Sequence, residues 1–312
     1  MNLQSYATGP QILVTVELQA NPLRLKTALG YLNWVFNPFQ RLGVVGVYDL
    51  LSTRSPTEQG LYLNLGYWPR AQNLDTASEA LAMLVADTAD MGPGHQVLDV
   101  GYGFGDQDML WMRRRGPERI TGLNVTASQV AVARQRVEDA GLAERIDLRQ
   151  GSATEMPIED ASVDRVVAVE CAFHFDTREA FFREAWRVLR PGGRLVVADI
   201  LPMPRAGGRW ARLTQRLSWW LVASKFAIPP ANAYTRPTYH SLLALRGFED
   251  IRVVSIRDQV YAPLHAYLRA HSRTVERLHP VARLAARFAL RFDASGVYGG
   301  LDYVLASAVK PA

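Results

Sequence analysis

The sequence predicts an α/β fold in which helices cover a largely parallel sheet. Short apolar runs, which are typical of buried strands, alternate along the chain with amphipathic stretches. This alternation is the pattern of βαβ units. A turn of the form G-x-G-x-G at residues 101–105 follows the first apolar run. Such a turn indicates a ligand site beyond the carboxyl ends of the strands.

The first strand is expected at Val97–Val100, directly before the glycine turn. Because glycine has no Cβ, Gly101, Gly103 and Gly105 let the backbone turn tightly and approach a ligand. The spacing differs from the dinucleotide fingerprint G-x-G-x-x-G, and no G-K-[ST] pair is present as in a P-loop. The turn therefore indicates a nucleotide-like ligand of another kind.

The second and third strands are expected at residues 120–123 and 146–149. Between them lies a stretch whose apolar positions are spaced as in a helix. Thr126 or Ser128 can cap the start of that helix.

The fourth strand, at 166–169, continues into the segment 170–175. A helix is then expected from about Arg178 to Arg190, followed by a turn at residues 191–193. The last three strands are expected at Leu195–Asp199, about Ile251–Ile256 and about Tyr303–Val309.

Four segments, in this order, resemble the successive motifs of class I S-adenosylmethionine-dependent methyltransferases: VLDVGYGFG, GLNVTASQV, GSATEMPIEDASVDRVVAVECAFHF and REAWRVLRPGGRLVVADI. The nearest branch holds erythromycin- and rebeccamycin-type sugar O-methyltransferases, ubiquinone/menaquinone and tocopherol methyltransferases, and prenyl diphosphate C-methyltransferases. The resemblance implies a Rossmann-like, seven-stranded, mostly parallel sheet with an antiparallel last strand and a helical substrate cap. It also implies S-adenosyl-L-methionine as the cofactor and no bound metal.

The resemblance assigns cofactor contacts along the strand ends. The glycine turn lies under the methionine part, Asp99 reaches the ammonium directly or through water, and Glu170 lies beside the sulfonium. This chain departs from many relatives at Tyr102, where they carry Cys, and at Asn124, where they carry an acidic residue for the ribose. The full set of expected cofactor-binding residues is Asp99, Gly101, Tyr102, Gly103, Gly105, Asn124, Val125, Gln129, Ala153, Thr154 and Glu170.

Plainer structural roles stay open for several of these residues. Asp99 can be satisfied by loop amides, Gln129 can be an exposed side chain beside a helix cap, and Thr154 can be a turn hydroxyl. A structural salt bridge is the alternative for Glu170.

Methyl transfer to a hydroxyl also needs a base. His174 is the expected general base, because it follows the fourth strand and imidazole titrates near neutral pH. Asp199, at the end of the fifth strand, is its expected orienting partner by resemblance to the sugar O-methyltransferases. A packed core histidine is the alternative for His174, and Cys171 is expected to be a packed thiol.

Aromatic segments outside this pattern predict the acceptor side of the site. They lie at residues 22–52, 202–236 and 259–299, and together they suit a small apolar or aromatic acceptor. The expected division is a lid segment at 1–73, the cofactor-binding core at 74–201, and cap insertions with the last two strands at 202–312.

Composition fits a cytoplasmic enzyme. A single cysteine fits a reducing compartment, and neither a signal peptide nor an apolar run long enough for a membrane span is visible. From Leu201 onward, 16 Lys and Arg face 6 Asp and Glu, a difference of +10, whereas the whole chain has a net charge of +5. No nucleic-acid-binding motif accompanies these arginines.

The aromatic and basic segment 22–52 is open to three interpretations, namely a lid, a peripheral membrane contact or a homodimer contact.

Three functions remain open at this point. The leading one is methylation of a small apolar acceptor at oxygen with His174 as base. The second is C-methylation of a prenyl diphosphate or prenylated natural product, with Glu170 and cap aromatics stabilising a carbocation and arginines holding the diphosphate. The third is a non-catalytic cofactor-binding partner protein.

Overall fold

A computed structural model describes residues 57–204, 207–278 and 280–312. The aromatic and basic segment 22–52, interpreted above as a lid, a membrane contact or a homodimer contact, lies outside these residues. The strands are β1 (Gln96–Val100), β2 (Arg119–Asn124), β3 (Ile146–Gln150), β4 (Val163–Val169), β5 (Leu189–Pro202), β6 (Glu249–Ser255) and β7 (Leu301–Val309). The helices of the core are α3 (Leu74–Thr88), α4 (Asp106–Arg114), α5 (Ala127–Asp139), α6 (Arg178–Val188) and α8 (Arg236–Leu245).

The strands form one sheet in the order β3-β2-β1-β4-β5-β7-β6. Strands β1 to β5 pair in parallel, whereas β7 runs antiparallel to both of its neighbours, β5 and β6. The predicted fold class is therefore confirmed, including the antiparallel last strand.

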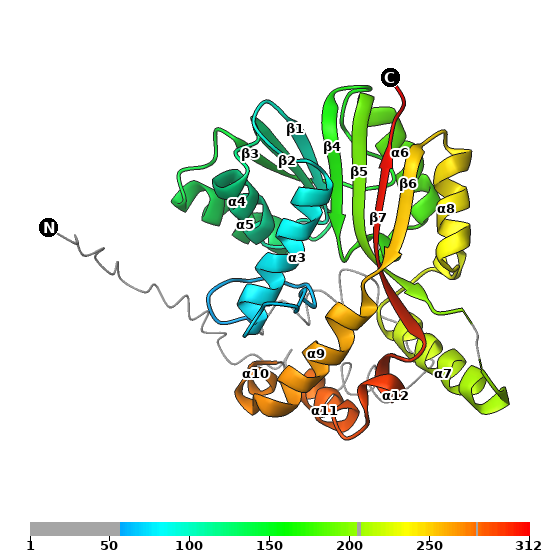
Figure 1. Cartoon of the computed structure of the whole chain (residues 1–312). Coiled ribbons are helices and arrows are strands. Elements are labelled where there is room, and N and C mark those ends of the chain that lie inside the picture. The colour runs from blue at the N-terminus through cyan, green and yellow to red at the C-terminus, as the bar shows by residue number, and fades with distance from the viewer. Residues whose placement is uncertain (1–56, 205–206, 279) are drawn as a thin grey trace, which may run out of the picture.

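Helices cover both faces of the sheet and give three layers (Figure 1). On one face, Leu81 of α3 and Trp111 of α4 pack in a cluster with Val130 of α5 and Ile120 of β2. On the other face, Phe181 of α6 joins residues of α8 and of the sheet in a second cluster. Alternate residues of the central strands β4 and β5 enter opposite clusters, because side chains of a strand point to its two faces in turn.

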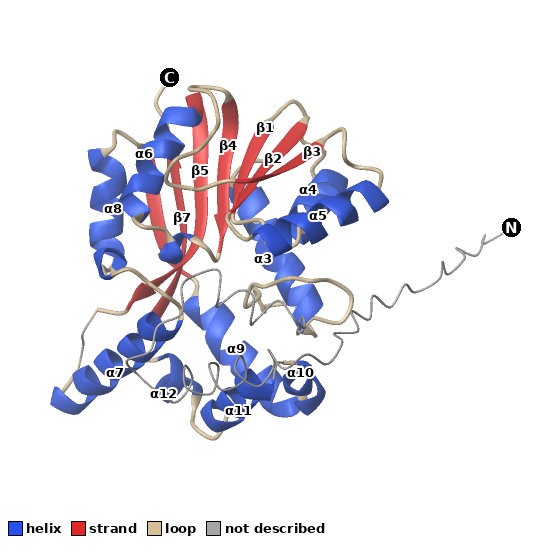
Figure 2. Ribbon diagram, turned by 180° about the vertical axis from the view of Figure 1, so that it is seen from behind, coloured by secondary structure: helices blue, strands red, loops and turns tan. Residues whose placement is uncertain are grey.

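The cap lies at the end of the sheet toward which the parallel strands point (Figures 1 and 2). It contains α7 (Arg209–Lys225), η2 (Pro230–Asn232), α9 (Arg257–Ala270), α10 (Ser272–Arg277), α11 (Pro280–Ala289) and α12 (Ala294–Tyr298). Among the described residues, no helix is both long enough and apolar enough to cross a bilayer.

Local details differ from the sequence-based expectations. Helix α6 ends at Val188 instead of Arg190, and the expected turn at 191–193 belongs to a longer β5 that already pairs with β4 at Leu189. The backbone of Gly192 donates to Lys310 O, and the Lys310 amide donates to Gly193 O, so the end of β7 holds this glycine pair within the sheet. The sequence around residues 191–193 does not indicate this pairing, because Lys310 lies more than a hundred residues away.

The start of α5 also differs. Thr126 is the N-cap residue, but its side chain makes no capping hydrogen bond. Asn124 accepts a hydrogen bond from the Thr126 amide instead (3.2 Å).

Candidate active site

A cavity of about 320 Å³ opens at the carboxyl ends of β1, β2 and β4. Its wall is formed by the glycine turn, the end of β2, the loop after β3, the segment after β4, and residues 61–64 before α3. The position is the one expected for a ligand in a parallel α/β sheet.

The glycine turn forms the floor of this cavity. Gly101 has a φ of 81°, and a Cβ at this position would lie 2.6 Å from the Cβ and Sγ atoms of Cys171. Gly103 has a φ of 58°, and its Cβ would meet only Leu63, at 3.5 Å. Both positions need glycine for their backbone conformation, and Gly101 needs it for space as well.

Asp99 lies behind the wall and not on it. Its carboxylate is fully buried and accepts a hydrogen bond from Gln107 Nε2 (2.7 Å), and Gln107 does line the cavity. Burial raises the pKa of Asp99 to about 7. Burial and the neighbouring charge of Asp99 together raise the pKa of Asp108 well above its usual range. Tyr102 lines the cavity, and its hydroxyl donates to Arg149 O (3.3 Å).

The end of β2 forms a second part of the wall. Asn124 is buried, and its Nδ2 donates to Gln129 Oε1 (2.8 Å) and to Gly103 O (3.3 Å). Gln129 is only 2% exposed, so its alternative as an exposed side chain is wrong. Val125 presents a half-exposed apolar side chain to the same cavity. Asn124 thus fastens the glycine turn to the start of α5.

Ala153 and Thr154 form the wall after β3. Ala153 is buried, and the hydroxyl of Thr154 lies 3.0 Å from that of Ser152. The Thr154 amide donates to the same Ser152 oxygen (3.2 Å), so the turn is closed locally.

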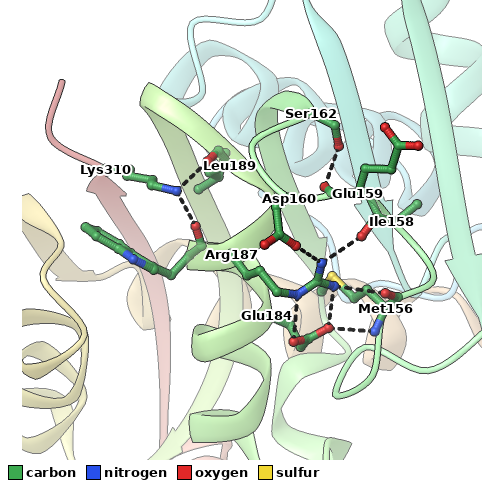
Figure 3. Close-up of polar contacts among 10 residues, drawn as sticks. Met156, Ile158, Glu159, Asp160, Ser162, Glu184, Arg187, Leu189 and Lys310 are labelled. Atoms are coloured by element: carbon green, nitrogen blue, oxygen red, sulfur yellow. Dashed lines mark hydrogen bonds and ion pairs between the residues drawn. The ribbon is translucent and has the colours of Figure 1, made fainter.

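Arg187 on α6 anchors the rest of this loop (Figure 3). Its guanidinium donates to Ile158 O (2.8 Å) and Met156 O (2.9 Å), and it pairs with Asp160 (2.6 Å) and Glu184 (2.8 Å). Hydrogen bonds to Arg187 lower the pKa of Glu184, which in turn accepts from the Met156 amide (2.8 Å). Arg187 and Glu184 therefore hold the loop through its backbone groups.

Glu170 places a carboxylate on the wall directly after β4. Its Oε1 accepts hydrogen bonds from Tyr303 Oη (2.6 Å) and from the Leu65 amide (2.6 Å). Burial raises the pKa of Glu170 to about 7, although both hydrogen bonds favour the ionised form. The carboxylate thus joins the end of β4 to β7 and to the chain before α3.

His174 ends the short helix η1 (Ala172–His174) and also lines the cavity. Its ring lies 4.1 Å from that of Phe173, and it is hydrogen-bonded to the backbone of Phe226. Burial lowers the pKa of His174 to about 3. The imidazole is consequently neutral at physiological pH.

Asp199 is not where the expected pairing with His174 requires it. It is fully buried and forms an ion pair with Arg178 Nε (2.8 Å), while its Oδ1 accepts from the Ile200 amide (2.8 Å). Val197 and Leu201, its alternate neighbours on β5, pack on the cluster with α6 and α8. Strand alternation therefore turns Asp199 toward those helices, and Arg178 is its partner.

The donor set fits S-adenosylmethionine. The carboxylates of Asp106, Glu170 and Asp176 line the cavity beside a floor of backbone, amides lie at the end of β2, and small apolar groups follow β3. Such a surface matches a cation, ribose hydroxyls and a flat base, respectively. Within the described part of the chain, no cluster of potential metal ligands occurs.

Sequence reasoning missed several cavity residues. Leu61–Asn64, Gln107 and Phe175 line the cavity, and Tyr303 holds Glu170. Gln107 could have been found, since it lies on the helix that follows the glycine turn. Nothing in the sequence around Tyr303 indicates that its hydroxyl reaches Glu170.

Comparisons with known proteins agree with this geometry. Residues 98–197 match the family model described as a methyltransferase domain. The chain is 37% identical over 276 residues to erythromycin 3''-O-methyltransferase of Saccharopolyspora erythraea, across 85% of this chain and 89% of that protein. It is 33% identical over 162 residues to 27-O-demethylrifamycin SV methyltransferase of Amycolatopsis mediterranei, across 52% of this chain and 59% of that protein.

Solved structures share the fold at lower identity. One is geranyl diphosphate C-methyltransferase from Streptomyces coelicolor A3(2), in complex with Mg²⁺, geranyl diphosphate and S-adenosyl-L-homocysteine. The match has a TM-score of 0.61 and 18% identity, and covers 93% of this chain and 99% of that one.

Proposed function

Because the chain belongs to the class I S-adenosylmethionine-dependent methyltransferases, we propose that it methylates a hydroxyl oxygen of a largely apolar natural product. The observation that carries the proposal is the 37% identity to an O-methyltransferase over nearly the whole of both chains. The cavity at the strand ends supports it, since its wall combines a carboxylate, an imidazole and apolar groups.

S-adenosyl-L-methionine supplies an electrophilic methyl group on a positively charged sulfur. In the proposal, the glycine turn lies under the methionine part. Asp99 does not touch the methionine ammonium directly and instead orients Gln107, which lines the cavity. Asn124, Val125 and Gln129 lie around the ribose. Ala153 and Thr154 lie at the adenine, and the Glu170 carboxylate attracts the sulfonium charge.

The chain contributes alignment and exclusion of water. The Gly101 turn, Asn124 and Glu170 are fixed by hydrogen bonds to distant segments, so the wall is formed before any ligand arrives. Holding donor and acceptor in line can supply a large share of the acceleration, with effective molarities of ~10⁵ M or more in favourable cases.

We propose His174 as the general base. Its ring lines the cavity and is neutral near pH 7, so it can accept the proton of an acceptor hydroxyl. Glu170 is the rival, because its pKa of about 7 matches the value that favours proton transfer near neutral pH.

The pH profile of turnover separates the two bases. With His174 as base and S-adenosylmethionine saturating, kcat/KM for the acceptor stays level from pH 5 to 8, because a group with a pKa of about 3 is already unprotonated there. With Glu170 as base, kcat/KM falls as the pH drops below about 7. The assay measures S-adenosylhomocysteine released with macrolide, glycoside and quinol acceptors.

Substitutions give the second readout. His174→Ala should lower turnover by ~10²-fold or more, with the affinity for S-adenosylhomocysteine little changed. His271→Ala, at an exposed histidine of the cap, is the matched control. Near-normal turnover of the His174 variant would show that this ring only packs the cavity wall.

The cavity favours a hydroxyl acceptor over a prenyl diphosphate. Among the described residues that line it, none is Arg or Lys, so this part of the wall offers a diphosphate no cationic side chain. Turnover with prenyl diphosphates and none with hydroxylated acceptors would overturn the proposed acceptor class.

We also propose a cytoplasmic location, which agrees with the single cysteine of the chain, the free and buried Cys171.

A further inference from the structure

Helix α7 has an inverted distribution of side chains. It buries Ser218 and Ser224, and the Ser218 hydroxyl donates to Val297 O (2.9 Å) next to α12. Five large apolar side chains of α7 face solvent, with Trp210 80% exposed, whereas Trp219 and Val222 pack against the core. The exposed apolar residues of α7 are Trp210, Leu213, Leu217, Trp220 and Leu221. Their spacing places them along one side of the helix.

Helix α11 and the turn after it repeat this pattern. Leu284, Phe288 and Phe292 are 49%, 61% and 51% exposed, and they recur every fourth residue. The two helices lie at the same end of the molecule in both views, opposite the C-terminus (Figures 1 and 2). Large exposed apolar side chains gathered at one end of a soluble protein are typical of an interaction site.

The charged residues of these helices are all basic. Helix α7 carries Arg209, Arg212, Arg216 and Lys225, and it contains no Asp or Glu. Residues 280–292 carry Arg283, Arg287 and Arg291 and likewise no acidic residue. Apolar and aromatic side chains beside a basic set are typical of helices that lie in the headgroup region of a bilayer.

We propose that α7 and α11 form a surface that docks on an anionic lipid bilayer. The apolar side chains would enter the headgroup boundary, and the arginines of α7 would contact lipid phosphates, whereas Arg287 of α11 already pairs with Glu276 (3.8 Å). A second copy of the chain is the less favourable occupant, because a symmetric interface would bring the same arginines against one another. This inference goes beyond the proposed function and does not depend on the acceptor.

The test is co-sedimentation of the full chain with vesicles of phosphatidylglycerol and phosphatidylcholine, compared with phosphatidylcholine alone. Binding is expected with the mixed vesicles at low salt and should weaken at high salt. The double variant Arg212→Glu/Arg216→Glu should bind about tenfold or more weakly, because each charge near the surface contributes separately. Trp210→Ser/Leu217→Ser should weaken binding by a similar factor through loss of the apolar contact.

Leu245→Ser is the matched control, since this side chain on α8 is also 80% exposed but lies outside the proposed surface. It should bind vesicles as the wild type does. Titration with S-adenosylhomocysteine shows that every variant keeps its fold and its cofactor site. Failure of the proposed function would leave these binding results unchanged.

Three outcomes would overturn the proposal. The wild type could fail to bind the mixed vesicles at low salt, or both double variants could bind as tightly as the wild type. Sedimentation velocity could also show a dimer that the Trp210→Ser/Leu217→Ser variant abolishes, with no vesicle binding, and the occupant would then be a second copy.

Discussion

Burial moves the pKa values of two cavity side chains in opposite directions. It raises that of Glu170 to about 7 and lowers that of His174 to about 3. Both shifts favour the neutral form, because a buried charge loses its hydration. Near neutral pH the cavity is therefore lined by a neutral imidazole and by a carboxyl group at the midpoint of its titration.

Cofactor affinity should depend on pH through Glu170. A sulfonium cation favours the carboxylate, so the affinity for S-adenosylmethionine should rise from pH 5.5 to pH 8, by up to tenfold per pH unit below about 7. S-adenosylhomocysteine, which lacks the sulfonium, should show a weaker dependence. Calorimetric titration across this range measures both.

Glu170→Gln is the control for this pH dependence, because Asp99 titrates in the same range. The variant should lose the difference in pH dependence between the two ligands. If the difference persists, another group carries it. Glu170 also affects folding, because the pKa of its side chain is 4.5 in the unfolded chain and about 7 in the folded protein. The folded state therefore binds the proton more tightly, and the contribution of Glu170 to stability is lost as the pH rises from 4.5 through 7.

The glycine turn offers a contrast between two neighbouring positions. Gly103→Val should abolish binding of S-adenosylhomocysteine, because the new side chain intrudes on the cavity floor, and it should cost less stability than Gly101→Val, because its Cβ meets only Leu63 and the strain comes from the φ of 58° alone. Gly101→Val should unfold at a lower temperature, because its Cβ would overlap Cys171. Calorimetry and thermal melts measure the two effects. Undiminished affinity of the Gly103 variant would remove the cofactor from the glycine turn.

At this scale, strand-end reasoning found much of the site. Gly101, Asn124, Glu170 and His174 lie at or after the end of a strand, and parallel strands bring their carboxyl ends together, so all four meet at one cavity. Asp199 was expected at the end of a strand, but β5 continues to Pro202, and the period of two turns the Asp199 side chain to the face of α6 and α8. The sequence pattern alone does not indicate which face of a strand points toward the ligand, so the direction of the Asp199 side chain could not be predicted.

Among the elements, α6 contributes an anchor for the adenine side of the site. Arg187 donates to two backbone carbonyls of the loop after β3 and to the carboxylates of Glu184 and Asp160, and lysine cannot reproduce this planar fork of donors. The loop's position was predictable from the sequence, whereas its anchor was not, because α6 lies about thirty residues further along the chain.

Arg187→Ala should cost about 1–3 kcal/mol of unfolding free energy, because hydrogen bonds to a charged group are lost. It should also weaken S-adenosylhomocysteine binding, since the loop holds Ala153 and Thr154 in the wall. Arg187→Lys should recover only part of both effects. Chemical denaturation and calorimetry provide the measurements.

Arg190→Ala is the comparison for that prediction. Arg190 pairs with Asp164 at the surface, so its loss should change stability by ~1 kcal/mol or less. An equal loss in both variants would mean that the Arg187 contacts have no special role in holding the loop.

Across the whole molecule, β7 holds the sheet together. It lies between β5 and β6, so β6 joins the sheet only through it. The family resemblance implied that the last strand is antiparallel, but not which strands lie beside it, because periodicity identifies strands and not their neighbours.

Deleting residues 301–312 should therefore abolish cooperative unfolding, because β5 and β6 would both present unpaired backbone. Deleting only residues 311–312, which follow β7, should leave the thermal transition unchanged. Circular dichroism melts compare the two. A sharp transition in the longer deletion would show that the other strands form an independent unit.

The late position of β7 also has a consequence for how the protein is made. All other strands are synthesised before it, and β7 must then enter between two of them, a pairing of high contact order that folds slowly. The same strand delivers Tyr303 to Glu170, so a nascent chain without β7 in place has an incomplete cavity wall. Cofactor binding then selects fully assembled molecules and, by mass action, protects them from reopening during biosynthesis.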